Sequence, residues 1–226
     1  MRRTSLVSAL VILSIAAAPA GKSVTVESRA FVSIVGNWLV TADNGRSVMM
    51  VDGRPWKRGQ PAGGLADKAR LIYGSRNEEF IDNVKAFAYF PYAVAQEIPE
   101  FQNGEISMRF KLIDGALDQC AGILFNLKPN GDYVTVRFNG KEDNLVLWTF
   151  KAGKRSFVKK GMEDVPLEMK KWYAMKIQVN GAALKGYLNG RLLLEYTLPE
   201  PVSGRVGLWS KTDSVAYFDD YTVTVE

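Results

Sequence analysis

The chain has 226 residues, of which 47% are apolar and 23% are charged, as in ordinary folded domains. Its formal net charge of +5 falls to +3 without Arg2 and Arg3, and so small an excess does not indicate a nucleic-acid partner. Histidine is absent and Cys120 is the single cysteine. These facts exclude Ser-His-Asp and Cys-His catalysis, histidine-based zinc sites and an intramolecular disulfide bond.

Residues 1–20 predict a secretory signal peptide that would be removed from residues 21–226. Two arginines near the start precede an apolar run over residues 6–18, and Ala18 and Ala20 stand where signal peptidase reads small residues. The run is short for a membrane span, and no second run of that length follows. We therefore expect an exported protein, periplasmic or extracellular, with no membrane span after cleavage; a retained anchor is the alternative.

Residues 52–83 are rich in glycine, proline and charge, and they predict long loops with at most one short helix. Further along, apolar and polar residues alternate, as over residues 106–112 and 173–179, which is typical of half-buried antiparallel strands. Turn sequences such as Asn139-Gly140 separate these stretches. Residues 21–226 therefore predict one all-β domain, a sandwich or a barrel.

The middle of the chain predicts a register for three strands. If loops occupy residues 128–131 and 140–143, Gly122 lies opposite Arg137, and Thr135 lies opposite Trp148. One parity is then wholly apolar and forms the core: Ala121, Ile123, Phe125, Val134, Val136, Phe138, Leu145 and Leu147. The other parity forms a mixed outer face: Asn126, Tyr133, Arg137, Asn139, Asn144 and Trp148.

This mixed face indicates sugar recognition. Pyranose rings present apolar C–H faces to aromatic rings and hydroxyls to amides and guanidinium groups. In the last part of the chain, Trp209 and Lys211 share the parity of this face if their strand joins the same sheet. The candidate glycan-binding residues are Tyr133, Arg137, Asn139, Asn144, Trp148, Trp209 and Lys211. The alternative is a solvated sheet face on which loops cover Tyr133 and Trp148.

Three other features have weaker functional interpretations. Adjacent Asp219 and Asp220 should point apart on a strand, which favours a bulge or turn over catalysis, although one of them could hold a structural calcium ion. Ser210 and Lys211 should also point apart, which excludes a Ser-Lys pair. The basic run over residues 151–160 indicates a solvated hairpin tip, or else a docking patch for an acidic polysaccharide or envelope surface.

From Phe101 onward the chain resembles exported bacterial domains of the concanavalin A-like jelly-roll superfamily, most of all the 3-keto-disaccharide hydrolase-like (3-keto-glucoside lyase/hydratase-like) group. The matching motifs are G-x-I-x-x-R-F-K, D-Q-x-A-G-I, Y-x-x-V-R-x-N followed by E-D-N, and G-x-V-G-L-W-x-K-x-D-S followed by F-D-D. The resemblance implies two packed antiparallel sheets and a glycan-related role. The Glu-x-Asp-x-x-Glu motif of the family 16 glucanases, which share this fold, is absent.

Three functions follow from these observations. The first is an exported jelly roll that binds a carbohydrate without chemistry. The second is a glycoside-active enzyme acting on a 3-keto sugar, in which Lys211 and Arg137 would work with an acid such as Glu142, Asp143 or Asp213. The third is a structural envelope or adhesion domain. The sequence indicates no cofactor beyond the possible calcium ion and does not indicate an oligomeric state.

Overall fold

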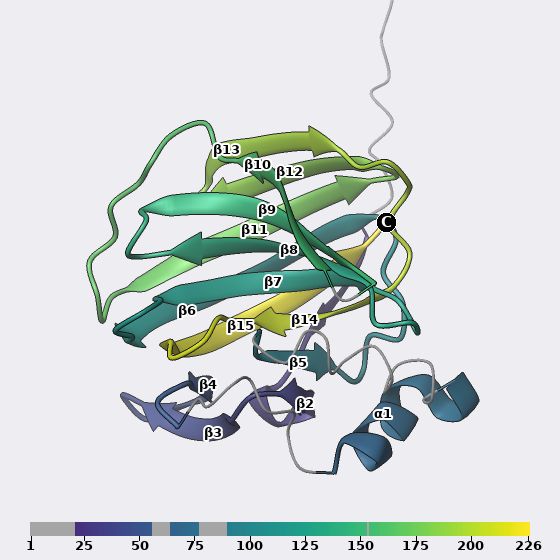
Figure 1. The fold of residues 1–226 in the computed structure, drawn as a ribbon, viewed down its shortest axis with the longest axis horizontal. Helices are drawn as coiled ribbons and strands as arrows, with labels where there is room; N and C mark the ends of the chain where they lie inside the picture. Colours follow the sequence, from purple (N-terminus) through teal and green to yellow (C-terminus); the bar gives the residue numbers. More distant parts are fainter. Residues whose placement is uncertain (1–20, 56–63, 77–89, 153) are drawn as a thin grey trace, which may run out of the picture.

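The computed structural model describes residues 21–55, 64–76, 90–152 and 154–226. The signal peptide predicted over residues 1–20 lies outside these ranges, as do residues 56–63 and 77–83 of the predicted loop segment. Within the described residues the chain forms two antiparallel sheets in two layers (Figure 1). No helix in these ranges is long and apolar enough to cross a membrane.

The first sheet has eight strands. Their order is β13 (Arg191–Thr197), β12 (Ala183–Leu188), β11 (Trp172–Asn180), β6 (Gly104–Asp114), β15 (Val215–Val225), β4 (Arg46–Asp52) and β3 (Trp38–Asp43), with β1 (Lys22–Thr25) paired to β15. The second sheet has seven strands. Their order is β10 (Lys154–Lys160), β9 (Asn144–Lys151), β8 (Tyr133–Asn139), β7 (Cys120–Leu127), β14 (Arg205–Trp209), β5 (Tyr92–Ala95) and β2 (Phe31–Val35).

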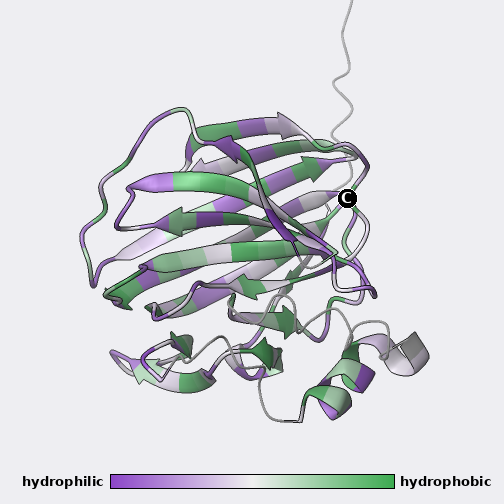
Figure 2. Cartoon of the chain, viewed as in Figure 1, coloured by the Kyte–Doolittle hydropathy of each residue, from purple (hydrophilic) through white to green (hydrophobic). Residues whose placement is uncertain are grey.

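The core between the sheets forms because apolar residues occupy every second position of the strands, an alternation visible along the strands in Figure 2. Ile106, Met108 and Phe110 of β6 are buried against Val136 and Phe138 of β8. Burying one such side chain contributes about 1.5–3 kcal/mol. All eight residues of the predicted apolar parity lie in this core, so the predicted all-β sandwich is confirmed.

The predicted register is confirmed across β7, β8 and β9. Gly122 pairs with Arg137, and Thr135 pairs with Trp148. Asn126 is the exception, and its predicted place on the mixed face is wrong. Its φ of 54° is left-handed, the ladder between β7 and β8 ends before it, and its side-chain oxygen accepts a hydrogen bond from the Ser203 N–H at 2.9 Å.

A second apolar cluster covers part of the outer face of the seven-stranded sheet. Helix α1 (Leu65–Tyr73), the short helix predicted in the loop-rich segment, buries Ala69 and Ile72 in this cluster. A short 3-10 helix, Gly74–Arg76, follows α1, and another, Ser28–Ala30, precedes β2. The cluster consists of Val32, Ile34, Val35, Ala69, Ile72, Tyr92, Val94, Cys120, Leu124, Leu127, Tyr133, Phe150 and Trp209. This end of the face is therefore not open to solvent.

A β-bulge in β15 overturns one expectation. The register shifts between Asp219 and Thr222, and Asp220 has a left-handed φ of 50°. Because the bulge rotates the chain, both carboxylates reach the same guanidinium: Arg46 Nη2 lies 3.0 Å from Asp219 and 2.8 Å from Asp220. The prediction that they point apart is wrong, whereas the bulge is confirmed. Across the described ranges, no three acidic or cysteine side chains gather closely enough to hold a metal ion.

Candidate binding face on the seven-stranded sheet

The candidate residues of β8, β9 and β14 share one face with Cys120, Gly122 and Leu124 of β7, here called the binding face. One row across the sheet runs from Trp209 through Gly122 and Arg137 to Val146. Glycine is needed at 122, because a Cβ there would lie 2.9 Å from Arg137 Cβ. Three further rows complete the face: Leu124, Thr135, Trp148 and Phe157; Tyr133, Phe150 and Arg155; and Cys120, Asn139 and Asn144.

The aromatic end of the binding face is covered. Trp209 is 1% exposed, and its indole N–H donates a hydrogen bond to the Tyr133 hydroxyl at 3.2 Å. Tyr133 stacks on Phe150 with ring centroids 4.2 Å apart, and Phe90 stacks on Trp209 at 5.8 Å. Trp209 therefore has the parity that the sequence predicts but lies beneath the surface, where its ring packs in the second apolar cluster and does not face solvent.

Trp148 is the aromatic candidate that keeps an exposed surface. It is half-buried, and two guanidinium groups lie near its ring, Arg155 at 4.3 Å and Arg137 at 6.0 Å from the centroid. Phe157 of the edge strand β10 packs edge-on against it at 5.6 Å. Cation–π contacts of this kind hold an indole in one orientation, which a stacking platform for a sugar ring requires.

Arg137 is fixed by hydrogen bonds below this surface. It is 4% exposed, it donates to Asn144 Oδ1 at 2.5 Å and to the Asn144 carbonyl at 3.2 Å, and it pairs with Glu142 at 2.7 Å. Burial raises the pKa of the Glu142 carboxyl, but the charge and hydrogen bonds of Arg137 outweigh it and hold the pKa below its usual value. Glu142 is therefore ionised at neutral pH, and with its side chain 44% exposed it can accept hydrogen bonds from a ligand.

A second ion pair lies at the same end of the sheet. Asp118 accepts hydrogen bonds from Lys211 at 2.9 Å, Thr212 at 2.7 Å and Asn139 at 3.2 Å. Lys211 therefore joins Asn139 through Asp118, and its ammonium group, 23% exposed, reaches solvent. Asp118 was missed in the sequence, although it precedes Cys120 by two positions and so shares its parity.

Cys120 links these two pairs in space. Burial raises the pKa of its thiol to about 12, and the charges of Arg137, Asp118, Lys211 and Glu142 all act on it as well. Cys120 lies opposite Asn139, which donates to Asp118, and Asn139 lies opposite Asn144, which accepts from Arg137, so both ion pairs lie near this buried side chain. The polar end of the binding face is a single cluster of two cations and two carboxylates, of which Glu142 and Lys211 are the members most open to solvent.

Asp213, one of the acids considered for catalysis, has a structural place. Its carboxylate accepts hydrogen bonds from the backbone N–H groups of Ala116, Leu117 and Asp118 at 2.8–3.2 Å. Burial raises the pKa of this carboxyl, but these hydrogen bonds outweigh it and hold the pKa below its usual value. Asp213 thus ties the loop before β7 to the loop after β14 and is not poised to move a proton.

Solved structures resemble the fold of this chain, whereas no family model and no curated protein matches the sequence. The carbohydrate-binding module CBM66 from Bacillus subtilis is 14% identical and superposes with a TM-score of 0.60 over 86% of this chain and 96% of the module. A Bacillus subtilis protein with a galectin-like fold is 12% identical, with a TM-score of 0.55 over 87% and 90% of the two chains. The fold is a concanavalin A-like jelly roll. The finer resemblance to the 3-keto-disaccharide hydrolase-like group stays a prediction.

Proposed function

We propose that this jelly roll binds a carbohydrate on its binding face, with Trp148 as the stacking ring. The observation that carries the proposal is the half-buried indole of Trp148 beside the fixed guanidinium of Arg137. A glycan that stacks on Trp148 and extends along the sheet toward the row of Asn139 and Asn144 would meet Glu142 and Lys211, the members of the polar cluster most open to solvent. Trp209 and Tyr133 support these groups from below.

Two independent observations support carbohydrate binding. The chemistry of the face combines an aromatic ring, amides and charged groups with directional hydrogen bonds, which is the combination that sugars need. The structural neighbours include a module whose name states carbohydrate binding and a protein with a galectin-like fold. The fold likeness raises the expectation of a glycan ligand without identifying it, because one fold hosts many functions.

Export is part of the same proposal. The basic start, the apolar run and the Ala18-Pro19-Ala20 sequence support cleavage after Ala20. N-terminal sequencing of the protein recovered outside the cytoplasm should begin at Gly21. Recovery of the full-length chain from the cytosol would contradict export.

The enzymatic alternative has less support. Proton abstraction beside a 3-keto group needs a free base, yet Glu142 is paired with Arg137 and Asp213 is held by backbone N–H groups. The arrangement does not favour turnover over binding. Release of product from a 3-keto-glucoside by the wild-type protein, and its loss in Glu142→Gln, would establish the enzyme instead.

The test of the proposal is a titration of neutral and acidic oligosaccharides against the wild-type protein, Trp148→Ala and Trp172→Ala. Trp172 is a matched control, because it is also half-buried beside an arginine, with Arg109 at 5.0 Å, but lies on the eight-stranded sheet. Trp148→Ala should weaken binding by about 1–2 kcal/mol, and Trp172→Ala should leave it unchanged. No binding by the wild-type protein, or equal binding by the Trp148 variant, would refute the proposal.

A further inference from the structure

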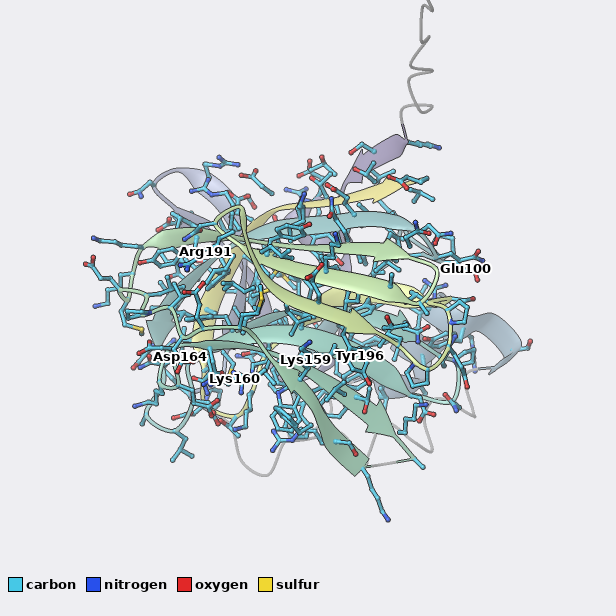
Figure 3. All side chains as sticks on the ribbon, turned by 90° about the horizontal axis from the view of Figure 1, so that it is seen from above. Glu100, Lys159, Lys160, Asp164, Arg191 and Tyr196 are labelled. Carbon is cyan, nitrogen blue, oxygen red and sulfur yellow. The ribbon has the colours of Figure 1, made fainter. Side chains whose placement is uncertain are left out.

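Among the residues that the structure describes, only some cations of the binding face have acidic partners. Arg137 pairs with Glu142 at 2.7 Å and Lys211 with Asp118 at 2.9 Å. At the edge, Lys160 of β10 lies opposite Val146 in the row of Arg137 and pairs with Asp164 at 2.7 Å; Figure 3 labels Lys160 and Asp164 close together. These three cations are each neutralised by one carboxylate.

Arg155 is different. It lies opposite Phe150 and therefore points to the binding face. Its guanidinium lies 4.3 Å from the Trp148 ring and 5.0 Å from the Phe90 ring. In the described part of the chain it makes no ion pair, and its contacts there are with rings alone. A guanidinium carries five N–H donors in a rigid fork. The aromatic rings orient Arg155, and none of its side-chain donors bonds to a described residue.

The surroundings of Arg155 add to this charge. The neighbouring Lys151, Lys154 and Lys159 are exposed, and none of them has a carboxylate partner among the described residues. By register, Lys154 lies opposite Lys151 and Lys159 opposite the core residue Leu147, so these lysines do not share the face of Trp148, whereas Arg155 does. The lysines still make the edge strand positive, and an excess of one charge sign attracts a ligand of the opposite sign. Electrostatic attraction alone would need no particular arginine, but the fixed position of Arg155 over Trp148 selects one.

We propose that the glycan bound at Trp148 is anionic and that Arg155 binds its carboxylate or sulfate group. This inference rests on the proposed function and names the ligand class for the same face. A sugar ring stacked on Trp148 would bring an acidic substituent to the N–H groups of Arg155. A planar carboxylate and a tetrahedral sulfate each present two oxygens that a guanidinium can bind with two hydrogen bonds.

The experiment compares charged glycans with neutral counterparts of the same backbone. The probes are an oligogalacturonate and its methyl ester, and dextran sulfate and dextran. Each is titrated into the wild-type protein, Arg155→Gln, the neighbouring control Lys154→Gln and Trp148→Ala. Melting curves would check that each variant is folded. We expect Arg155→Gln and Lys154→Gln to fold because both side chains are exposed.

The charged member of at least one pair should bind the wild-type protein more tightly than its neutral counterpart. Arg155→Gln should lower the affinity for that charged glycan about tenfold and the affinity for its neutral counterpart much less, through the lost cation–π contact with Trp148 alone. Lys154→Gln should lower the affinity for the charged glycan less than about threefold, by long-range charge alone. The pair that responds distinguishes carboxylate from sulfate.

Two results would overturn the inference while leaving the proposed function in place. One result is that the wild-type protein binds charged and neutral glycans equally tightly and that Trp148→Ala abolishes the binding of both. The other is an equal loss in Arg155→Gln and Lys154→Gln, which would show that the basic hairpin attracts anions without a specific contact. Binding of no glycan at all would refute the proposed function itself.

Discussion

Replacing each tryptophan of the binding face by alanine should have different effects on stability, because Trp209 lies beneath the surface and Trp148 is partly exposed. Trp209 is 1% exposed and belongs to the second apolar cluster, so Trp209→Ala removes a fully buried indole. A change of this kind lowers the free energy of unfolding by about 3–5 kcal/mol, through lost burial and the cavity that remains. The Tyr133 hydroxyl oxygen also loses the hydrogen bond that the indole N–H donates to it.

The loss in the free energy of unfolding should appear as a lower melting temperature. For a domain of this size each kcal/mol shifts the midpoint by about 2–4 °C, so Trp209→Ala should melt roughly 6–20 °C below the wild-type protein. Trp148 is half-buried, and its contacts with Arg155 and Arg137 are worth about 0.5–1 kcal/mol each at a partly exposed site. Trp148→Ala should therefore melt only a few degrees lower, and glycan binding should be its main loss.

Thermal unfolding followed by near-UV circular dichroism, with urea titration to obtain the free energy, would measure both variants. Phe157→Ala serves as a control, since this ring is exposed and touches Trp148 without entering either cluster. If Trp209→Ala melts within about 2 °C of the wild-type protein, the second cluster does not stabilise the fold. If Trp148→Ala loses as much stability as Trp209→Ala, Trp148 is a core residue and the binding face has no exposed ring.

Three further changes have definite expected outcomes. The Asp213 carboxyl has a lowered pKa in the folded state, so the stability it contributes is present above the unfolded pKa and is lost as pH falls through the folded pKa. Asp213→Ala should lower the free energy of unfolding by about 1.5–3 kcal/mol at pH 7. It should also make the urea midpoint depend less on pH in the acid range. The Cys120 thiol, buried and with a pKa raised to about 12, should not react with a thiol reagent at pH 8 until urea unfolds the protein, which absorbance during a urea titration would show. Arg137→Met should change stability by at most about 1–2 kcal/mol in chemical unfolding, because Glu142 is exposed enough to be hydrated alone, while removing most glycan affinity in calorimetry.

The core and the register could be predicted from the sequence because both depend on local alternation. A one-residue slip of β8 would have moved Val136 and Phe138 out of the core and Arg137 into it, so hydrophobic burial fixes one register. The failures occurred where the backbone leaves the extended region. Asn126 and Asp220 have left-handed φ values, and a strand pattern read two residues at a time does not detect a residue that breaks it.

The membership of the binding face was predictable, but its exposure was not. Trp209 and Tyr133 have the expected parity, yet residues far away in the chain cover them: Ile72 of α1 lies in their cluster and Phe90 packs on Trp209. Arg155 was missed for a different reason. Arg155 lies opposite Phe150 on β10, but the predicted register stopped at β9.

The buried position of Arg137 is the feature that stability explains least. Moving a guanidinium out of water costs several kcal/mol, and a pair with a half-exposed carboxylate recovers only part of that free energy. An apolar side chain at 137 would fill the space left by Gly122 with no such cost. The row of Arg137 also contains the buried Trp209, and Trp148 lies in the next row. Glu142 and Asn144 accept hydrogen bonds from the guanidinium and keep it rigid. Rigid, directional polar groups beside an exposed ring are what ligand recognition needs and what folding alone does not, and this is the physical reason to place the binding site here.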